Sequence, residues 1–82
     1  MQRIDFVLRG EHIALDALLK ATGLAGSGGI AKQMITAAQV QVDGEVELRR
    51  SRKTRAGQIV EVPGAHIHVH AAAMEQHPPS GS

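Results

Sequence analysis

Apolar residues at the start of the chain recur at every second position, as Ile4, Phe6 and Leu8. This period of two predicts a β-strand with one buried face. Over residues 13–22 the spacing changes to that of a helix with one apolar side. The leucines on that side are Leu15, Leu18 and Leu19. This first helix is expected to end at Gly23, in the left-handed conformation of a C-terminal cap.

A second amphipathic helix is expected after the glycine-rich segment GLAGSGG. Ser27 is its expected N-cap, because the serine hydroxyl can accept a backbone N–H two or three residues further on. The apolar stripe of this helix consists of Ile30, Ala31, Met34, Ile35 and Ala38.

The segments VQV and VEL flank an Asp-Gly pair and predict a β-hairpin. Val40, Val46 and Leu48 are expected to face the core. If Val40 and Val46 share one face, the loop between the strands contains an odd number of residues. A three-residue connection with Gly44 in the left-handed conformation is therefore favoured over a two-residue turn.

Residues 49–55, RRSRKTR, contain five basic side chains: Arg49, Arg50, Arg52, Lys53 and Arg55. The chain has nine Lys and Arg against eight Asp and Glu, so the remainder, with four basic and eight acidic residues, has a net charge of −4. An uninterrupted strand with Leu48 in the core would also bury Arg50 and Arg52, which is costly for unpaired charges. The strand is therefore expected to bulge or end near Arg49 and to leave this basic arm solvated and projecting.

Such sorting of charge favours a nucleic acid or another polyanion as partner, because each neutralised phosphate releases condensed counterions. An ordinary exposed, charged loop is the alternative. Phe6 is the only Phe, Tyr or Trp in the chain, so several bases cannot be held by aromatic stacking. Binding would then depend on phosphates and on the shape of the nucleic acid.

The start of the second helix is a further candidate for phosphate contacts. Ser27, Gly28 and Gly29 leave the positive end of the helix accessible, and Lys32 lies one turn further on. A flexible connection between the helices is the alternative. The segment lacks the Gly-Lys-Ser/Thr ending of a nucleotide-binding loop, so no ATP or GTP site is expected.

Two more strand-like segments, QIVEV and HIHVH, are separated by the turn dipeptide Pro63-Gly64. His66, His68 and His70 fall on one face of the second segment. Alternate histidines on a strand can ligate a transition metal, but a solvated strand face is the favoured interpretation. No metal site and no other cofactor is predicted.

The composition fits one small domain, expected over residues 1–72, followed by a disordered tail at residues 73–82. The chain has no cysteine, which excludes a disulfide framework. There is no signal peptide and no segment of the roughly 20 apolar residues that span a bilayer, so we expect a cytoplasmic protein without a membrane partner. No nucleophile is paired with a base, so neither an enzyme nor a small-molecule substrate is expected.

Four segments, taken in order, resemble the S-four domain, an RNA-binding module named for a small-subunit ribosomal protein. The segments are LDALLKATGL, SGGIAKQMI, VQVDGEVELRRSRK and AGQIVEV. In particular, the chain is similar to the short stand-alone bacterial proteins of the YbcJ type, which share the Ser-Gly-Gly-x-Ala-Lys helix start. The resemblance covers residues 13–62.

The resemblance implies an α+β fold in which two N-terminal helices pack on a small antiparallel β-sheet, the αL-type RNA-binding motif. It also implies RNA binding without catalysis, with contacts from residues 27–32 and 49–55. Three positions depart from the family pattern. Gly28 stands where many members have Arg, Ala38 where Gly is usual, and Gln58 where Asp is usual.

We therefore expect a small protein that contacts phosphates of structured RNA, such as ribosomal or transfer RNA, through the basic arm and the start of the second helix. The alternative is a protein-interaction adaptor whose basic arm docks on the acidic surface of a partner protein.

Overall fold

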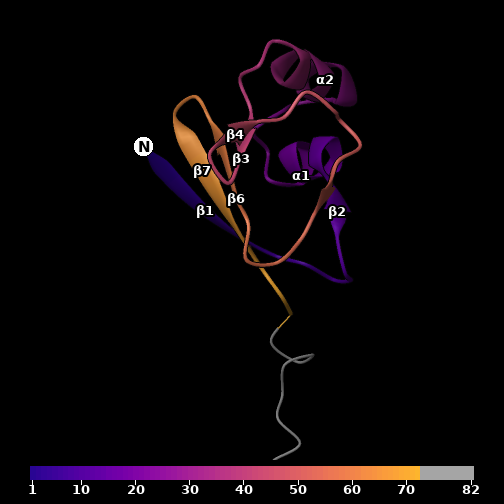
Figure 1. The fold of residues 1–82 in the computed structure, drawn as a ribbon, viewed down its shortest axis with the longest axis vertical. Helices are drawn as coiled ribbons and strands as arrows, with labels where there is room; N and C mark the ends of the chain where they lie inside the picture. Colours follow the sequence, from indigo (N-terminus) through magenta and orange to yellow (C-terminus); the bar gives the residue numbers. More distant parts are fainter. Residues whose placement is uncertain (73–82) are drawn as a thin grey trace, which may run out of the picture.

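The computed structural model describes residues 1–72, and the segment expected to be a disordered tail, residues 73–82, lies outside them. Two helices lie on one side of a β-sheet (Figure 1). In chain order the elements are β1 (Gln2–Val7), β2 (Ile13–Ala14), α1 (Leu15–Ala21), α2 (Gly28–Thr36), β3 (Gln41–Val42), β4 (Glu45–Val46), β5 (Lys53–Thr54), β6 (Ile59–Val62) and β7 (Ala65–His70). Neither helix of this described part is long and apolar enough to cross a membrane.

The main sheet has the strand order β1-β7-β6-β3-β4, and β2 pairs with β5 in a separate two-stranded sheet. The α+β class is thus confirmed, but two details of the expected architecture are wrong. The helices, which the resemblance implies to be N-terminal, follow β1 and β2, and β1 confirms the strand predicted from the alternation at the start of the chain. The main sheet is mixed rather than antiparallel, because β1 runs parallel to β7. A parallel pair requires a long crossover connection. Here the crossover consists of both helices and strands β2 to β6.

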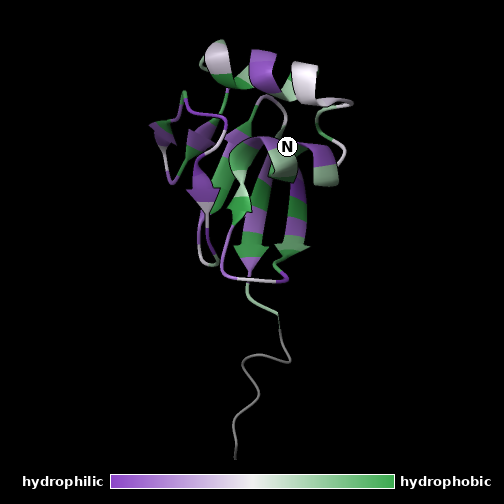
Figure 2. Ribbon diagram, turned by 90° about the vertical axis from the view of Figure 1, so that its right-hand side faces the viewer, coloured by the Kyte–Doolittle hydropathy of each residue, from purple (hydrophilic) through white to green (hydrophobic). Residues whose placement is uncertain are grey.

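The hydrophobic core lies between the helices and the inner face of the sheet. Its largest fully buried side chains are Leu15, Leu18, Leu19, Ile35, Val40, Val60 and Ile67, together with the polar Thr54. Apolar and polar residues alternate along the long strands, so that one face of the sheet is apolar (Figure 2). The helix predicted from the leucine spacing is confirmed, and Gly23 follows it with φ of 81°. In the second helix, Ile30 is exposed and does not belong to the buried stripe, and Ala38, which is also exposed, lies beyond the end of the helix at Thr36.

The β3–β4 hairpin differs from the expected one. Gln41 pairs with Val46, so the turn consists of Asp43 and Gly44 alone. Both turn residues have positive φ, 53° and 86°, as in the type I′ turn that matches the twist of a hairpin. Val46 and Leu48 are 51% and 56% exposed, so the prediction that they face the core is wrong.

The register explains which residue occupies the core face instead. The backbone N–H of Glu47 donates to the carbonyl of Val40 at 3.0 Å, so Glu47 lies opposite a fully buried valine. Cross-strand neighbours share one face of a sheet. An acidic side chain therefore enters the edge of the core, where it is 9% exposed.

Ala38, the residue that departs from the family's usual Gly, has φ of 61°. This left-handed conformation is strained for alanine, whereas glycine adopts it without steric cost. Ala38→Gly should therefore raise the free energy of unfolding by about 1 kcal/mol, as measured by urea denaturation. The matched control is Ala37→Gly, at φ of −82°, which should lower stability or leave it unchanged. An Ala38→Gly variant that is less stable than the wild type would contradict the assigned geometry.

Candidate nucleic-acid interface

The backbone of the basic arm (residues 49–55) is held against the start of α1. The N–H of Leu15 donates to the carbonyl of Arg52 at 2.9 Å, and the N–H of Asp16 donates to the carbonyl of Arg50 at 3.0 Å. These carbonyls satisfy donors that the first turn of a helix leaves without intrahelical partners. Strand β5, inside the arm, also pairs with β2. The expectation of a freely projecting arm is therefore wrong for its backbone.

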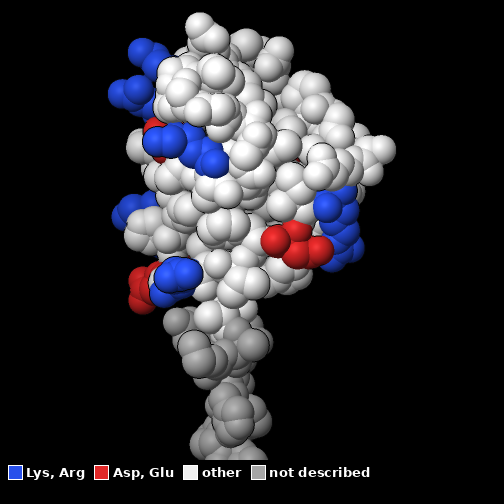
Figure 3. Space-filling model, turned by 180° about the vertical axis from the view of Figure 1, so that it is seen from behind, with Lys and Arg blue, Asp and Glu red and all other residues white. Residues whose placement is uncertain are grey.

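Most side chains of the arm nevertheless face solvent. Four basic residues are exposed: Arg49, Arg50, Lys53 and Arg55. The side chain of Arg52 is 31% exposed, and Thr54, which also belongs to the arm, is fully buried. Seen from behind, most of the visible basic side chains lie along one edge of the molecule, and others lie beside acidic side chains at the opposite edge (Figure 3). An open hollow of about 350 Å³ on this surface is lined by Arg49, Ser51, Arg52 and Lys53.

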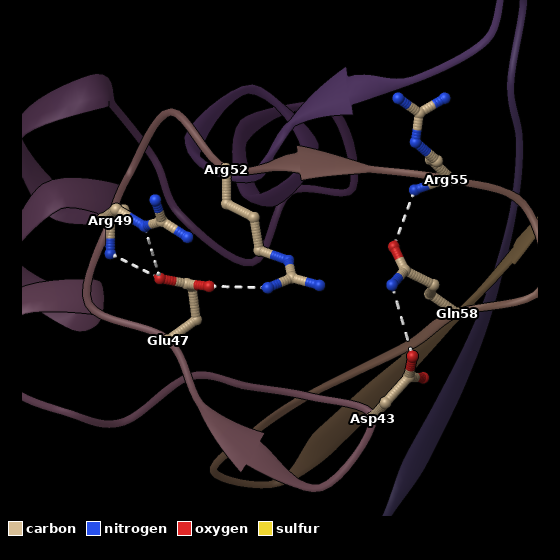
Figure 4. A network of polar contacts seen from close by, with 6 residues as sticks. All are labelled: Asp43, Glu47, Arg49, Arg52, Arg55 and Gln58. Carbon is tan, nitrogen blue, oxygen red and sulfur yellow. Dashed lines mark hydrogen bonds and ion pairs between the residues drawn. The ribbon is translucent and has the colours of Figure 1, made fainter.

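Glu47 joins the beginning of the arm to its middle (Figure 4). One carboxylate oxygen accepts the backbone N–H of Arg49 at 3.0 Å and its Nε at 3.4 Å. The other oxygen accepts Nη1 of Arg52 at 2.7 Å. Hydrogen bonds between ionised groups are among the strongest in proteins. These bonds compensate the burial of the carboxylate and fix the direction of two arginine side chains.

The same bonds hold the pKa of Glu47 far below its usual range. The hydrogen bond from Arg52 is the largest cause and the backbone N–H of Arg49 the second, and together with the Arg49 side chain they lower the pKa to about 2 against the opposing effect of burial. Glu47 is therefore ionised throughout the physiological pH range, and the ion pairs with the arm persist there.

This lowered pKa makes the stabilising effect of Glu47 depend on pH. The effect is fully present above the unfolded-state pKa, near 4.5, and is lost as the pH falls toward 2. The difference in free energy of unfolding between the wild type and Glu47→Gln should therefore be largest near neutral pH and shrink between pH 4.5 and about 2. Urea unfolding of both proteins at the two ends of this range measures it. A difference that stays constant would show that Glu47 is not ionised in these pairs.

The end of the arm is fixed by Gln58. Its Oε1 accepts the backbone N–H of Arg55 at 2.8 Å, and its Nε2 donates to Oδ2 of Asp43 at 3.3 Å (Figure 4). Asp43 belongs to the type I′ turn, and its other oxygen accepts the N–H of Ile59 at 2.9 Å. The arm is thus held at both ends and in the middle, and Gln58 serves as a link between the arm and the hairpin.

The start of α2 has the geometry that the sequence predicts. The hydroxyl of Ser27 accepts the N–H of Ile30 at 3.2 Å, which confirms the N-cap. Gly28, Gly29 and Lys32 are exposed, and a side chain added at Gly28 would meet no atom within 4 Å. Within residues 1–72, no hydrogen bond or ion pair joins this helix start to the basic arm. The two candidate elements are therefore not joined by polar contacts.

Comparison with known proteins identifies the family to which these features belong. The family model described as S4 domain matches residues 6–70. The chain is a member of the S4 domain family. This result confirms the resemblance drawn from the four sequence segments and extends it to β1 and β7.

Relatives of this S4 domain include proteins from Escherichia coli and Bacillus subtilis. The Escherichia coli (strain K12) protein named "Putative RNA-binding protein YbcJ" is 45% identical over 58 residues, which cover 71% of this chain and 83% of the relative. The Bacillus subtilis (strain 168) protein named "Probable ribosome maturation protein RlbA" is 39% identical over 54 residues, 66% of this chain and 76% of the relative.

A solved structure is also similar to this S4 domain. The solution structure of E. coli YbcJ, described as revealing an αL motif involved in RNA binding, has a TM-score of 0.66 and 43% sequence identity. The match covers 82% of this chain and 86% of YbcJ. The fold of the chain is therefore that of YbcJ.

The histidines of β7 lie on the outer face of the sheet in this S4 domain, away from the core. His70 Nε2 is 2.8 Å from Oδ1 of Asp5, and the rings of His66 and His68 contact edge to face. Burial is the main cause that lowers the pKa of His68. Among the described residues, no group of three or more His, Cys, Asp or Glu side chains is placed to hold a metal ion.

Sequence reasoning missed Glu47, Asp43 and Gln58 as residues that shape the arm. The buried position of Glu47 could have been predicted from the Asp-Gly pair, because a two-residue turn places Glu47 on the same face as Val40. The contact between Gln58 and Asp43 joins residues 15 positions apart and has no local sequence signal.

Proposed function

We propose that this protein binds structured RNA, such as ribosomal or transfer RNA, in the cytoplasm and without catalysing a reaction, through an S4 domain that spans residues 1–72. The observation that carries the proposal is the basic arm, with five Lys and Arg in seven positions on a backbone hydrogen-bonded to α1. Cationic groups on a fixed backbone can contact successive phosphates without ordering the chain at each binding event.

The kind of RNA recognition follows from the side chains that the chain offers. Phe6, the single large aromatic residue, is half-buried against the core and offers no stacking platform. Recognition through phosphates and the wide minor groove of A-form RNA depends on shape more than on base sequence. We therefore expect helical or compactly folded RNA to bind more tightly than an unstructured strand of the same length.

The comparisons support the proposal at the level of the family. The names of two relatives refer to RNA binding and to ribosome maturation, and the structure of YbcJ is described in terms of an RNA-binding motif. The membership of this chain in the same family and its basic arm are both consistent with an RNA partner. A ribosomal RNA partner would agree with the name of the Bacillus relative.

The start of α2 is proposed as a second, smaller contact. The N-terminal end of a helix favours an anion, and the small residues there allow a phosphate to approach the backbone. The residues concerned are Ser27, Gly28, Gly29 and Lys32. Because Gly28 replaces an Arg that is frequent in the family, this contact should contribute less than the arm.

Affinity purification with and without ribonuclease tests the proposed function against the adaptor alternative. We expect the tagged protein to recover RNA, and we expect any co-purifying proteins to be lost after complete RNA digestion. Protein partners that survive digestion, together with the absence of recovered RNA, would favour an adaptor that docks on an acidic protein surface.

A further inference from the structure

Glu47 opposes the charge of the arm and at the same time organises it. It is the one acidic side chain that pairs with the arm within residues 1–72, through Arg49 and Arg52. On charge alone it should weaken binding to RNA, since it reduces the charge of residues 47–55 from +5 to +4. Its contacts, however, determine where two of the five cationic groups point.

The position of Glu47 explains why the bonds that it accepts from the arm should affect RNA binding more than its negative charge does. The side chain of Glu47 is 11% exposed and lies at the edge of the core, whereas the side chain of Arg49 is 77% exposed. It also accepts the backbone N–H of Arg49, at the point where the chain leaves the hairpin and enters the arm. Without this acceptor, the first residues of the arm would lose the bonds that fix their direction.

The direction of the Arg52 side chain depends on Glu47 more than that of the Arg49 side chain does. Its Nη1 lies 2.7 Å from the carboxylate, and its side chain lines the hollow together with Arg49 and Lys53. Its backbone carbonyl accepts the N–H of Leu15, so the main chain is held independently of the side chain. Removal of the carboxylate would thus release the guanidinium while leaving the backbone of the arm attached to α1.

We propose that Glu47 is a positioning residue for RNA binding, which holds Arg49 and Arg52 around the hollow of the arm so that they meet phosphates in a preformed arrangement. The inference rests on the proposed function. It predicts that a substitution that makes the protein more positive weakens its binding to a polyanion, the opposite of the simple electrostatic expectation.

The decisive variant is Glu47→Gln, tested by fluorescence anisotropy with a labelled RNA hairpin. We expect its affinity at physiological salt to fall about 10-fold, and the slope of log affinity against log salt to become shallower by about 1.4–1.8, as for the loss of two phosphate contacts. The matched control is Glu45→Gln, which makes the same charge change at an exposed position two residues earlier. Glu45→Gln should bind as tightly as the wild type or slightly more tightly.

A double-mutant cycle separates positioning from a general loss of structure. If Glu47 acts through Arg52, the affinity losses of Glu47→Gln and Arg52→Gln should not add in the double variant. Additive losses would show that Glu47 does not act through Arg52, and a Glu47→Gln affinity equal to or above that of the wild type would overturn the proposal outright.

Glu47→Asp provides a second route if the Gln variant does not fold, as judged by circular dichroism. It keeps the net charge but shortens the side chain by one methylene group, so a folded Asp variant should bind less tightly than the wild type and with a shallower salt slope. Wild-type affinity in this variant would contradict the positioning role. If the wild type itself does not bind the hairpin, the proposed function fails rather than the role of Glu47.

Discussion

Replacing Arg50, Lys53 and Arg55 with Gln is expected to lower RNA affinity by on the order of 10- to 100-fold at physiological salt. These three side chains are exposed, and the variant leaves the ion pairs of Glu47 with Arg49 and Arg52 intact. Each lost phosphate contact removes roughly 0.7–0.9 from the slope of log affinity against log salt, so the slope should become shallower by about 2–3. Fluorescence anisotropy over a salt series measures both effects.

A second triple variant with the same net charge as the first distinguishes the effect of the arm on RNA affinity from the effect of the overall charge of the protein. Arg3, Arg9 and Lys20 are exposed basic residues outside the arm, and their joint replacement with Gln also removes three positive charges. This control should lose much less affinity and keep most of the salt slope. Equal losses in the two triple variants would show that RNA responds to net charge and not to the arm.

Leu19→Ala should lower the free energy of unfolding by about 2–5 kcal/mol, the second large effect we expect. Leu19 is fully buried in α1, and its truncation removes apolar contacts and leaves a cavity. For a domain of this size, the melting temperature should fall by roughly 10 °C or more. Urea and thermal denaturation followed by circular dichroism measure the change.

Leu48→Ala is the matched control, because it removes the same atoms from a side chain that is 56% exposed. Its effect on stability should stay within about 0.5 kcal/mol. A cost close to that of Leu19→Ala would place Leu48 in the core, as the alternation of the sequence predicts, and would contradict the type I′ hairpin and the position of Glu47.

The helices could be predicted because their signals are local. The leucine spacing, the C-terminal Gly23 and the capping hydroxyl of Ser27 each depend on neighbours within one turn, and all three are confirmed. The Pro63-Gly64 turn between β6 and β7 is equally local, and the structure has these two residues between the strands. Such elements form from short-range geometry and do not depend on the tertiary arrangement.

The hairpin register could not be predicted from alternation alone. Hydrophobicity assigned Val46 and Leu48 to the core, whereas the Asp-Gly turn places Glu47 there. A carboxylate is tolerated at the edge of the core because Arg49 and Arg52, two and five residues later, bond to it. That compensation arises from the fold of the arm, which local patterns do not describe.

The sheet topology and the attachment of the arm are also non-local. No local feature of β1 indicates that it runs parallel to β7, since its partner lies more than 60 residues away. The excess of basic residues in the arm was evident from the sequence, but its hydrogen bonds to α1 were not. The sequence therefore indicated the chemistry of the candidate site, and the structure shows how that chemistry is fixed in place.

If the proposed function is right, the basic arm contacts RNA, with a smaller contribution from the start of α2. Titration of the ¹⁵N-labelled protein with an RNA hairpin, followed by amide chemical shifts in two-dimensional NMR spectra, locates the contact residue by residue. We expect the largest shifts at residues 49–55, smaller shifts at residues 27–32, and little change on the outer face of β7 at His66 and His68. Shifts concentrated on the outer face of the sheet, with the arm unchanged, would contradict the proposal.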